Sequence, residues 1–197
     1  IVGDLPSFES APLTTATTCT EYPATIDDLY LCGVSASIDG PGRVLGRAGP
    51  RFVRDSGLTI TGEMTFDTAD IDSLRADGTF LGVVKHEMAH VLGMGTLWQN
   101  AGLYDGVSGA YKSGTVAESE WRNIGCTGPL PVELDGEPGT AGAHWDDVCL
   151  KDEIMTGFRS GDTPLSRITI GSLSDLGYTV NFEAADPFGI ADLGSCG

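Results

Sequence analysis

Residues His86-Glu87-Met88-Ala89-His90 combine two imidazoles and a carboxylate at a spacing that suits metal chemistry. On an α-helix, residues four positions apart lie one turn apart on the same face, so His86 and His90 can reach one ion. Glu87 is rotated from His86 by about 100° around the helix, which brings its carboxylate near a metal-bound water rather than into the ligand set. Zinc lowers the pKa of such a water to roughly 7, and Glu87 can take its proton as the water attacks a carbonyl carbon. The motif predicts a hydrolytic zinc site with Glu87 as the general base.

A third ligand must come from outside this motif. The chain contains three histidines, and His144 is the remaining one. A catalytic zinc site usually has three protein ligands and an open fourth position, so His144 completes such a set. A structural zinc site would instead need a fourth protein ligand, for which Asp146 or a cysteine could serve. Met155 follows His144 in the short segment 152–157 and could place its thioether beneath the metal, although methionine in a turn usually fills the core.

The elements around the motif fit this chemistry. Residues 58–66 alternate between an apolar face, which includes Leu58, Ile60 and Gly62, and a polar one, a pattern typical of a half-buried strand. A helix is predicted from Thr79, as its N-cap, to Leu92, with Gly93 ending it in the left-handed conformation. Both histidines and Glu87 therefore fall on an apolar helix that follows a strong strand.

The rest of the chain gives weaker signals. The first 28 residues read as an extended surface segment, a strand is predicted over 29–38, and residues 43–54 are interrupted by glycine and proline. Residues 94–143 are mostly irregular, with one short helix after a capping box that starts at Thr115. Ser166 is expected to cap a helix that ends at Gly177, and residues 178–182 to form a last short strand.

Composition limits the function classes. The 197 residues are 41% apolar, enough for one domain with a real core, and the formal charge of −17 would repel nucleic acid and an anionic membrane surface. No apolar run is long enough to cross a bilayer, and the start at Ile1 lacks the features of a signal peptide, so the chain reads as a mature, soluble product. The aspartates around Asp70, Asp72, Asp146 and Asp147 leave calcium as an accessory ion, without any EF-hand loop.

The five cysteines include no C-x-x-C pair, which argues against a thiolate zinc site and favours disulfides in an oxidising compartment. Sequence order favours the pairs Cys19–Cys32 and Cys126–Cys149. The odd cysteine would then be Cys196, beside the end of the chain.

Taken together, these residues resemble the metzincin clan of metallopeptidases, and specifically its leishmanolysin-like branch. His86 to Gly93 matches the first eight positions of the metzincin pattern, but Thr96 stands where most members have the third histidine. In the leishmanolysin-like branch an insertion separates the glycine from that ligand, which is similar to the segment 94–143 before His144. The resemblance extends to Met155 and to the segment 165–178, and covers most of the chain after about Leu58.

The resemblance implies His86, His90 and His144 as zinc ligands, Glu87 as general base and Met155 as the floor of the site. It also implies an edge strand over residues 58–66, with Leu58, Ile60 and Gly62, that binds an extended polypeptide substrate by strand addition.

Two departures from the family pattern stand out. Gly157 occupies the position where some metzincins have an oxyanion-binding tyrosine. In addition, the strand and long helix that usually open the domain have no counterpart before Leu29, so a missing N-terminal segment could be a covalent or noncovalent partner.

The sequence therefore predicts an α+β, metzincin-like zincin catalytic domain, with a twisted mixed sheet and an active-site helix over a largely irregular C-terminal subdomain. Residues 1–93 would form the N-terminal subdomain and residues 94–197 the C-terminal one. The expected function is a secreted zinc endopeptidase with one catalytic ion, no nucleic-acid partner and no membrane insertion. The alternative is a non-catalytic extracellular adhesion or binding domain that keeps a structural zinc site.

Overall fold

The computed structural model describes residues 1–9, 22–137, 139–157 and 163–196. They divide into two compact units, of which one is Gly3–Gly93 and the other combines Ile1–Val2 with Met94–Gly197. Each unit is described in its own right. The chain is a mixed α/β protein with small sheets, and in its described part no helix has the length and apolarity needed to cross a membrane.

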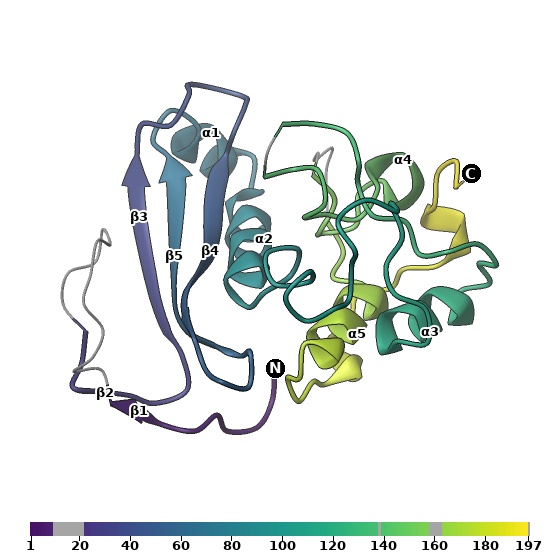
Figure 1. Cartoon of the computed structure of the whole chain (residues 1–197). Coiled ribbons are helices and arrows are strands. Elements are labelled where there is room, and N and C mark those ends of the chain that lie inside the picture. Colours follow the sequence, from purple (N-terminus) through teal and green to yellow (C-terminus); the bar gives the residue numbers. More distant parts are fainter. Residues whose placement is uncertain (10–21, 138, 158–162, 197) are drawn as a thin grey trace. The chain divides into compact units, whose positions relative to one another are not determined.

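The described residues of the first unit include a three-stranded sheet and two helices (Figure 1). The strands are β3 (Tyr30–Ala36), β4 (Gly46–Val53) and β5 (Thr59–Asp67), and the helices are α1 (Ile71–Ala76) and α2 (Phe80–Val91). A separate pair of two-residue strands, β1 (Phe8–Glu9) and β2 (Thr25–Ile26), lies near the start of the chain. The strands predicted over 29–38 and 58–66 are confirmed as β3 and β5, whereas β4 and α1 were not predicted.

β5 is the central strand of the sheet, parallel to β3 on one side and antiparallel to β4 on the other. The prediction that residues 58–66 form a half-buried edge strand is therefore wrong. Ile60 and Gly62 lie within a strand that is paired on both sides, so its backbone cannot pair with a peptide. Its polar positions are buried as well, with Thr61 and Glu63 at 1% and 7% exposure. Alternation in the sequence marked a strand correctly, but it could not reveal that neighbours cover both faces.

β4 is an edge strand of this sheet, and no further strand of the described residues pairs with it. Its glycines and Pro50 explain why no strand was predicted here, because both residue types are depleted in strand interiors. Proline lacks an N–H group, and an edge strand tolerates it. A bulge interrupts the pairing with β5 between Pro50 and Val53 and leaves Arg51 without an opposite residue.

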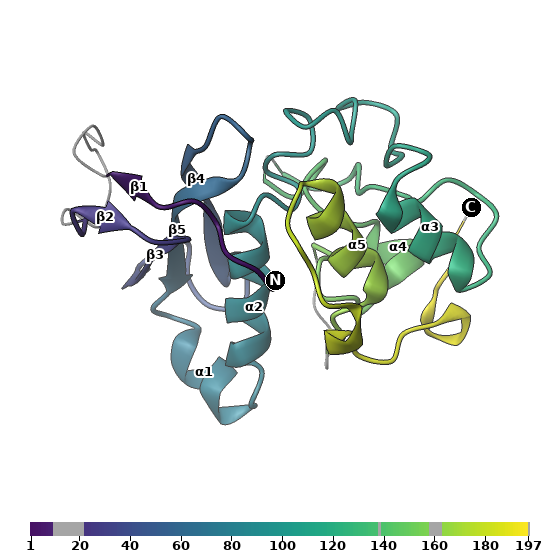
Figure 2. The ribbon, with the colours of Figure 1, turned by 90° about the horizontal axis from the view of Figure 1, so that it is seen from below.

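α1 and α2 lie on the same side of the three-stranded sheet (Figure 2). Met64 and Phe66 of β5 pack with Val83 and Val91 of α2 in the core of this unit. Gly62 is needed for close packing, because a Cβ atom there would lie 2.2 Å from Val91 Cγ1. The predicted helix is confirmed, and Gly93 ends it at φ 109°. Thr79 occupies the N-cap position without a side-chain capping bond, so that detail of the prediction is wrong.

The loop between β3 and β4 is fastened by one buried carboxylate. Asp67 Oδ2 accepts hydrogen bonds from the backbone N–H groups of Ile38, Asp39 and Gly40, and Oδ1 accepts one from Ala69. These bonds hold the pKa of Asp67 below its usual range, because they favour the charged form.

The described residues of the second unit form three α-helices and two short 3₁₀ helices joined by long loops. The α-helices are α3 (Val116–Asn123), α4 (Asp147–Leu150) and α5 (Arg167–Asp175), and the 3₁₀ helices are η1 (Phe182–Ala184) and η2 (Ile190–Asp192). The predicted caps are confirmed, since Thr115 Oγ1 accepts from Glu118 N and Ser166 Oγ accepts from Thr169 N. The strand predicted over 178–182 is wrong, because residues 178–181 form no regular secondary structure and η1 begins at Phe182.

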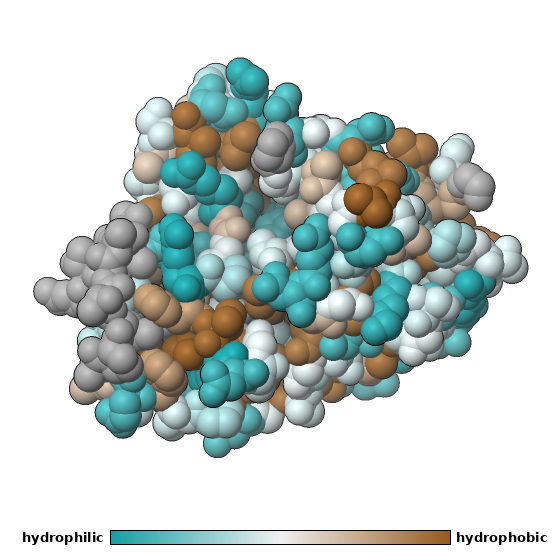
Figure 3. Space-filling model, in the orientation of Figure 1, coloured by the Kyte–Doolittle hydropathy of each residue, from teal (hydrophilic) through white to brown (hydrophobic). Residues whose placement is uncertain are grey.

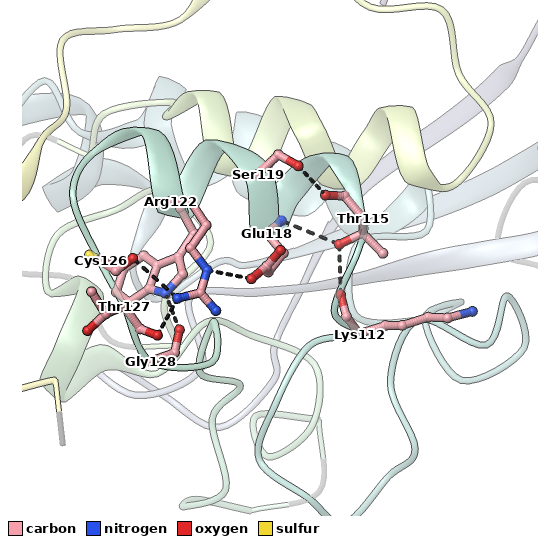
Figure 4. A network of polar contacts seen from close by, with 9 residues as sticks. Lys112, Thr115, Glu118, Ser119, Arg122, Cys126, Thr127 and Gly128 are labelled. Atoms are coloured by element: carbon pink, nitrogen blue, oxygen red, sulfur yellow. Dashed lines mark hydrogen bonds and ion pairs between the residues drawn. The ribbon is translucent and has the colours of Figure 1, made fainter.

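α3 is held by its neighbours at both ends. At its N-terminus, Asp175 of α5 accepts hydrogen bonds from the backbone N–H groups of Val116 and Ala117. At its C-terminus, Arg122 pairs with Glu118 and donates to the carbonyl oxygens of Cys126 and Thr127 (Figure 4). The second contact folds the chain after α3 back against the helix.

The cysteine pairing of this unit differs from the prediction. Cys149 is bonded to Cys196, and Cys126 is the free thiol in the described part of the chain. The predicted pair Cys126–Cys149 and the predicted free Cys196 are therefore wrong. Proximity in sequence misled, because η2 and the segment after it return the chain end to α4. Cys32 is disulfide-bonded, and its predicted partner, Cys19, lies outside the described residues.

Candidate metal centre

Two of the three predicted ligands are brought together by α2. His86 and His90 are one turn apart, and their Nε2 atoms lie 3.0 Å apart. Two nitrogen ligands at 2.0–2.1 Å from a tetrahedral zinc ion would be about 3.3 Å apart. The spacing of the two imidazoles therefore fits a shared zinc ion without a change of helix geometry.

Glu87 lies beside this pair on the same helix and against the first residue of β4. A Cβ atom on Gly46 would lie 2.7 Å from Glu87 Oε1 and 3.0 Å from Cδ. The carboxylate thus occupies the space that a side chain at position 46 would need. Sequence reasoning missed Gly46, because a glycine in a segment rich in turn residues has no signal of its own.

His144 belongs to the second unit and is positioned by its backbone neighbours. Its carbonyl oxygen accepts a hydrogen bond from Glu133 N, and Trp145 N donates to Met155 O. The side chain is oriented by Thr140, whose carbonyl oxygen lies 3.0 Å from His144 Nδ1. With Nδ1–H donated to this oxygen, the lone pair on Nε2 is left for a metal.

Trp145 anchors this segment in the core of its unit. Its ring stacks at 4.6 Å from that of Trp98, and its indole N–H donates to Thr169 Oγ1 at 2.9 Å. Tyr111 packs edge-on against both tryptophans. The residue next to His144 is therefore fixed by a rigid aromatic cluster, although the cluster itself was not predicted.

Met155 is fully buried beside Trp145, and Glu153 holds the turn that contains it. One oxygen of Glu153 accepts from Met155 N at 2.7 Å, and the other accepts from Ser166 N, Ser166 Oγ and Thr169 Oγ1. Burial raises the pKa of Glu153, although the four bonds act in the opposite direction. Glu153 was also missed from the sequence, where an acid in an apolar turn was the available signal.

The electrostatic environment of His144 favours its neutral form. Burial lowers the pKa of the imidazole, while the bond to Thr140 and the carboxylate of Glu133 act to raise it. Burial and the neighbouring Glu133 carboxylate raise the pKa of Asp147 to about 6. A neutral imidazole is the form that binds zinc.

Gly157 packs directly against the segment of the third histidine. A Cβ atom there would lie 2.6 Å from Thr140 Cγ2 and 3.7 Å from His144 Cγ. A tyrosine at this position, as in some metzincins, would thus collide with the residues that orient His144.

The proposed ligands therefore divide between the two units, with His86 and His90 on α2 and His144 in a loop of the second unit. The association of His144 with the other two histidines stays a prediction. So do the roles of Glu87 and Met155 and the binding of calcium. Ile60 and Gly62 lie in β5, whose central position removes the edge-strand basis of their predicted substrate binding, and Leu58 precedes that strand.

The chain is thus a mixed α/β protein that carries two histidines and a glutamate of a metal-binding motif on α2. Residues 26–197 match the Leishmanolysin peptidase family, and the chain belongs to that family. It is 32% identical over 171 residues to a leishmanolysin homolog of Crithidia fasciculata, covering 80% of this chain and 25% of that protein. A leishmanolysin-like peptidase of Caenorhabditis elegans is 35% identical over 74 residues, covering 36% of this chain and 11% of that protein.

A leishmanolysin-like peptidase of Drosophila melanogaster is 39% identical over 57 residues, which cover 28% of this chain and 8% of that protein. The chain thus spans a quarter or less of the length of these curated relatives.

Proposed function

We propose that this protein is a zinc-dependent endopeptidase that holds one ion through His86, His90 and His144 and hydrolyses polypeptide substrates. The observation that carries the proposal is the pair of Nε2 atoms 3.0 Å apart on α2, with Glu87 on the adjoining helix position. Membership of a zinc-dependent peptidase family supports the same conclusion.

The roles of the individual residues follow from their chemistry. Zinc, when bound, supplies a water of lowered pKa and polarises the scissile carbonyl group. The Glu87 carboxylate accepts the proton of the attacking water and delivers it to the leaving amine. Gly46 leaves room for that carboxylate because it has no side chain. The carbonyl of Thr140 orients His144 through Nδ1. Met155 acts as an apolar packing residue beneath the histidine segment.

A non-catalytic zinc module would need a fourth protein ligand, and Asp146 and three of the suggested cysteines are engaged elsewhere. Cys126 keeps a free thiol, but it belongs to no group of described side chains that could hold a metal ion together. Asp146 Oδ1 caps α4 by accepting from Cys149 N, and Cys149 is itself bonded to Cys196. Cys32 is also in a disulfide. These contacts favour a three-ligand site with an open position, which is the catalytic arrangement.

The test is the Glu87→Gln variant, assayed for zinc content and for cleavage of an unfolded protein such as casein. We expect about one zinc per chain in both wild type and variant, and a loss of cleavage of at least about a hundredfold. Glu137→Gln, at an exposed position, is the matched control and should cleave like wild type. Unchanged cleavage by Glu87→Gln would contradict the proposed mechanism.

A further inference from the structure

The outer edge of β4 offers a peptide the backbone pairing that β5 cannot. β4 is antiparallel to β5, and its other side carries no strand of the described residues. An edge strand presents a row of backbone N–H and C=O groups that can pair with an extended chain. This edge also begins at Gly46, against the Glu87 carboxylate, so a chain paired with β4 would pass the proposed general base.

The face of β4 directed away from α2 carries two arginines and a hollow between them. Ala48 packs into the core with α2, so its neighbours Arg47 and Gly49 project on the opposite face. The hollow has a volume of about 390 Å³ and is lined by residues of β4 and β5: Arg47, Ala48, Gly49, Pro50, Arg51, Glu63 and Thr65. Gly49 leaves room at its centre because it has no side chain. In Figure 3 the surface over the middle of β4 is mostly hydrophilic or of intermediate hydropathy.

The two arginines differ in how they are held. Arg51, at the bulge, donates to Glu63 through Nε at 2.8 Å and through a second nitrogen, which fixes its guanidinium beside the hollow. Arg47 is exposed, and no carboxylate of the residues described pairs with it. Arg47 is therefore a free cation at one end of the hollow, and Arg51 is a fixed one at the other.

Positive charge is concentrated in the part of the sequence that forms β4 and its flanks. Four of the 11 basic residues fall within 43–54, and this segment contains no aspartate or glutamate. Elsewhere the chain is strongly acidic, with 28 acidic residues in total. Because salt screens exposed charges over about 8 Å at physiological ionic strength, an acidic side chain in the hollow would respond mainly to the charges that line it. These are Arg47, Arg51 and the Glu63 carboxylate, which is paired with Arg51 and leaves Arg47 as the excess positive charge.

We propose that this hollow is a subsite for an aspartate or glutamate side chain of an extended peptide paired with β4. The proposal rests on the proposed function and adds a substrate class to it. A side chain opposite Gly49 would lie on the same face as Arg47 and Arg51, at diagonal positions about 7–8 Å away that a carboxylate on a long side chain can bridge. Gly49 is three residues from Gly46, so the acidic residue falls about 10 Å along the peptide from the bond facing Glu87.

The test compares peptides that differ only in carrying Glu, Gln or Lys at one position, scanned over the residues three to four away from a single cleavable bond. Binding is measured by fluorescence anisotropy on the Glu87→Gln protein, and kcat/KM on the active protein. We expect the Glu peptide to be favoured over the Gln peptide by about fivefold, both in binding to Glu87→Gln and in kcat/KM of the wild type. Arg47→Glu should abolish this preference and favour the Lys peptide instead.

Arg43→Glu is the matched control, because it changes the charge equally at a turn position that precedes β4. It should keep the preference for Glu. Cleavage of all three peptides with equal efficiency would overturn the acidic subsite and leave the endopeptidase intact. Arg47-dependent binding without any cleavage by wild type would support the subsite and refute the endopeptidase. Absence of both binding and cleavage would refute both.

Discussion

Gly46 at the start of β4 lies so close to Glu87 that a Cβ atom would come within 2.7 Å of Oε1. The Gly46→Ala variant should therefore displace the carboxylate without touching the histidines. We expect zinc content to remain at the wild-type level while kcat falls by about tenfold or more, because general-base catalysis depends on the position of the base. Gly33→Ala in β3 is the control, since its Cβ atom would meet only Met64 Cε at 3.8 Å. An unchanged kcat in Gly46→Ala would show that Glu87 tolerates the displacement.

Gly157 is expected to control the affinity for zinc through His144. In Gly157→Ala, the new methyl group meets Thr140 Cγ2 at 2.6 Å and disturbs the residue that orients the imidazole. Zinc affinity, measured by competition with a chelator, should fall by about 10- to 100-fold, as for other losses of a partner that orients a ligand. Adding Thr140→Ser removes the colliding methyl group and should restore most of the affinity. Failure of this rescue would mean that the loss has another origin.

Glu153 is expected to be the most important buried polar residue for stability in the second unit. Glu153→Ala leaves the N–H groups of Met155 and Ser166 without their acceptor, and we expect unfolding free energy to fall by about 3 kcal/mol or more. Glu153→Gln retains one carbonyl oxygen and should lose about half as much. Chemical denaturation with Glu137→Gln as the exposed control measures both. Equal stability of the alanine variant and the control would contradict the assignment.

Asp67 contributes to the stability of the folded protein, and the direction in which this contribution changes with pH follows from its pKa. Its pKa is lowered in the folded protein, so its stabilising effect is present above the unfolded value of about 3.9 and is lost as pH falls through the folded value. Asp67→Asn should therefore lower Tm at neutral pH, and the difference from wild type should narrow in acid. Asp55→Asn, in an exposed turn, should show no such trend. A difference in Tm that does not depend on pH would mean that the charge of Asp67 is not what holds the loop.

The cysteine arrangement can be checked by alkylation of the native protein and disulfide mapping. Cys126 should be the cysteine of the second unit that reacts, and a peptide linking Cys149 to Cys196 should be recovered. Reaction should be slow at neutral pH, because burial raises the pKa of the Cys126 thiol and lowers the thiolate fraction. Recovery of a Cys126–Cys149 link would contradict the structure.

The strongest predictions from sequence were those that depend on neighbouring residues along the chain. The helix that carries His86 and His90, its glycine stop and the caps at Thr115 and Ser166 all follow from local rules, and the structure confirms them. The exception among the local predictions is the capping bond expected from Thr79. β4 was missed, because its glycines and proline suit only an edge strand, and edge position is a property of the whole sheet.

The errors share this non-local origin. Alternation in residues 58–66 marks a strand, but whether its edges are free depends on which other segments pair with it. The Cys149–Cys196 bond joins residues 47 positions apart, a distance that sequence order disfavours. Glu153 and Gly46 act through partners that are remote in sequence, Thr169 and Glu87, and no local pattern identifies them.

The backbone of Glu133 is bonded to both Gly142 and His144, because its carbonyl oxygen accepts from Gly142 N and its N–H donates to His144 O. These two hydrogen bonds close the loop between Glu133 and Gly142 at its base. Closing a longer loop costs only about 0.6 kcal/mol for each doubling of its length, so residues added before Thr140 would leave His144 bonded to Glu133. Residues could therefore be gained or lost in the part of this loop before Thr140, while Thr140 and the backbone bonds of Glu133 keep the His144 imidazole in place.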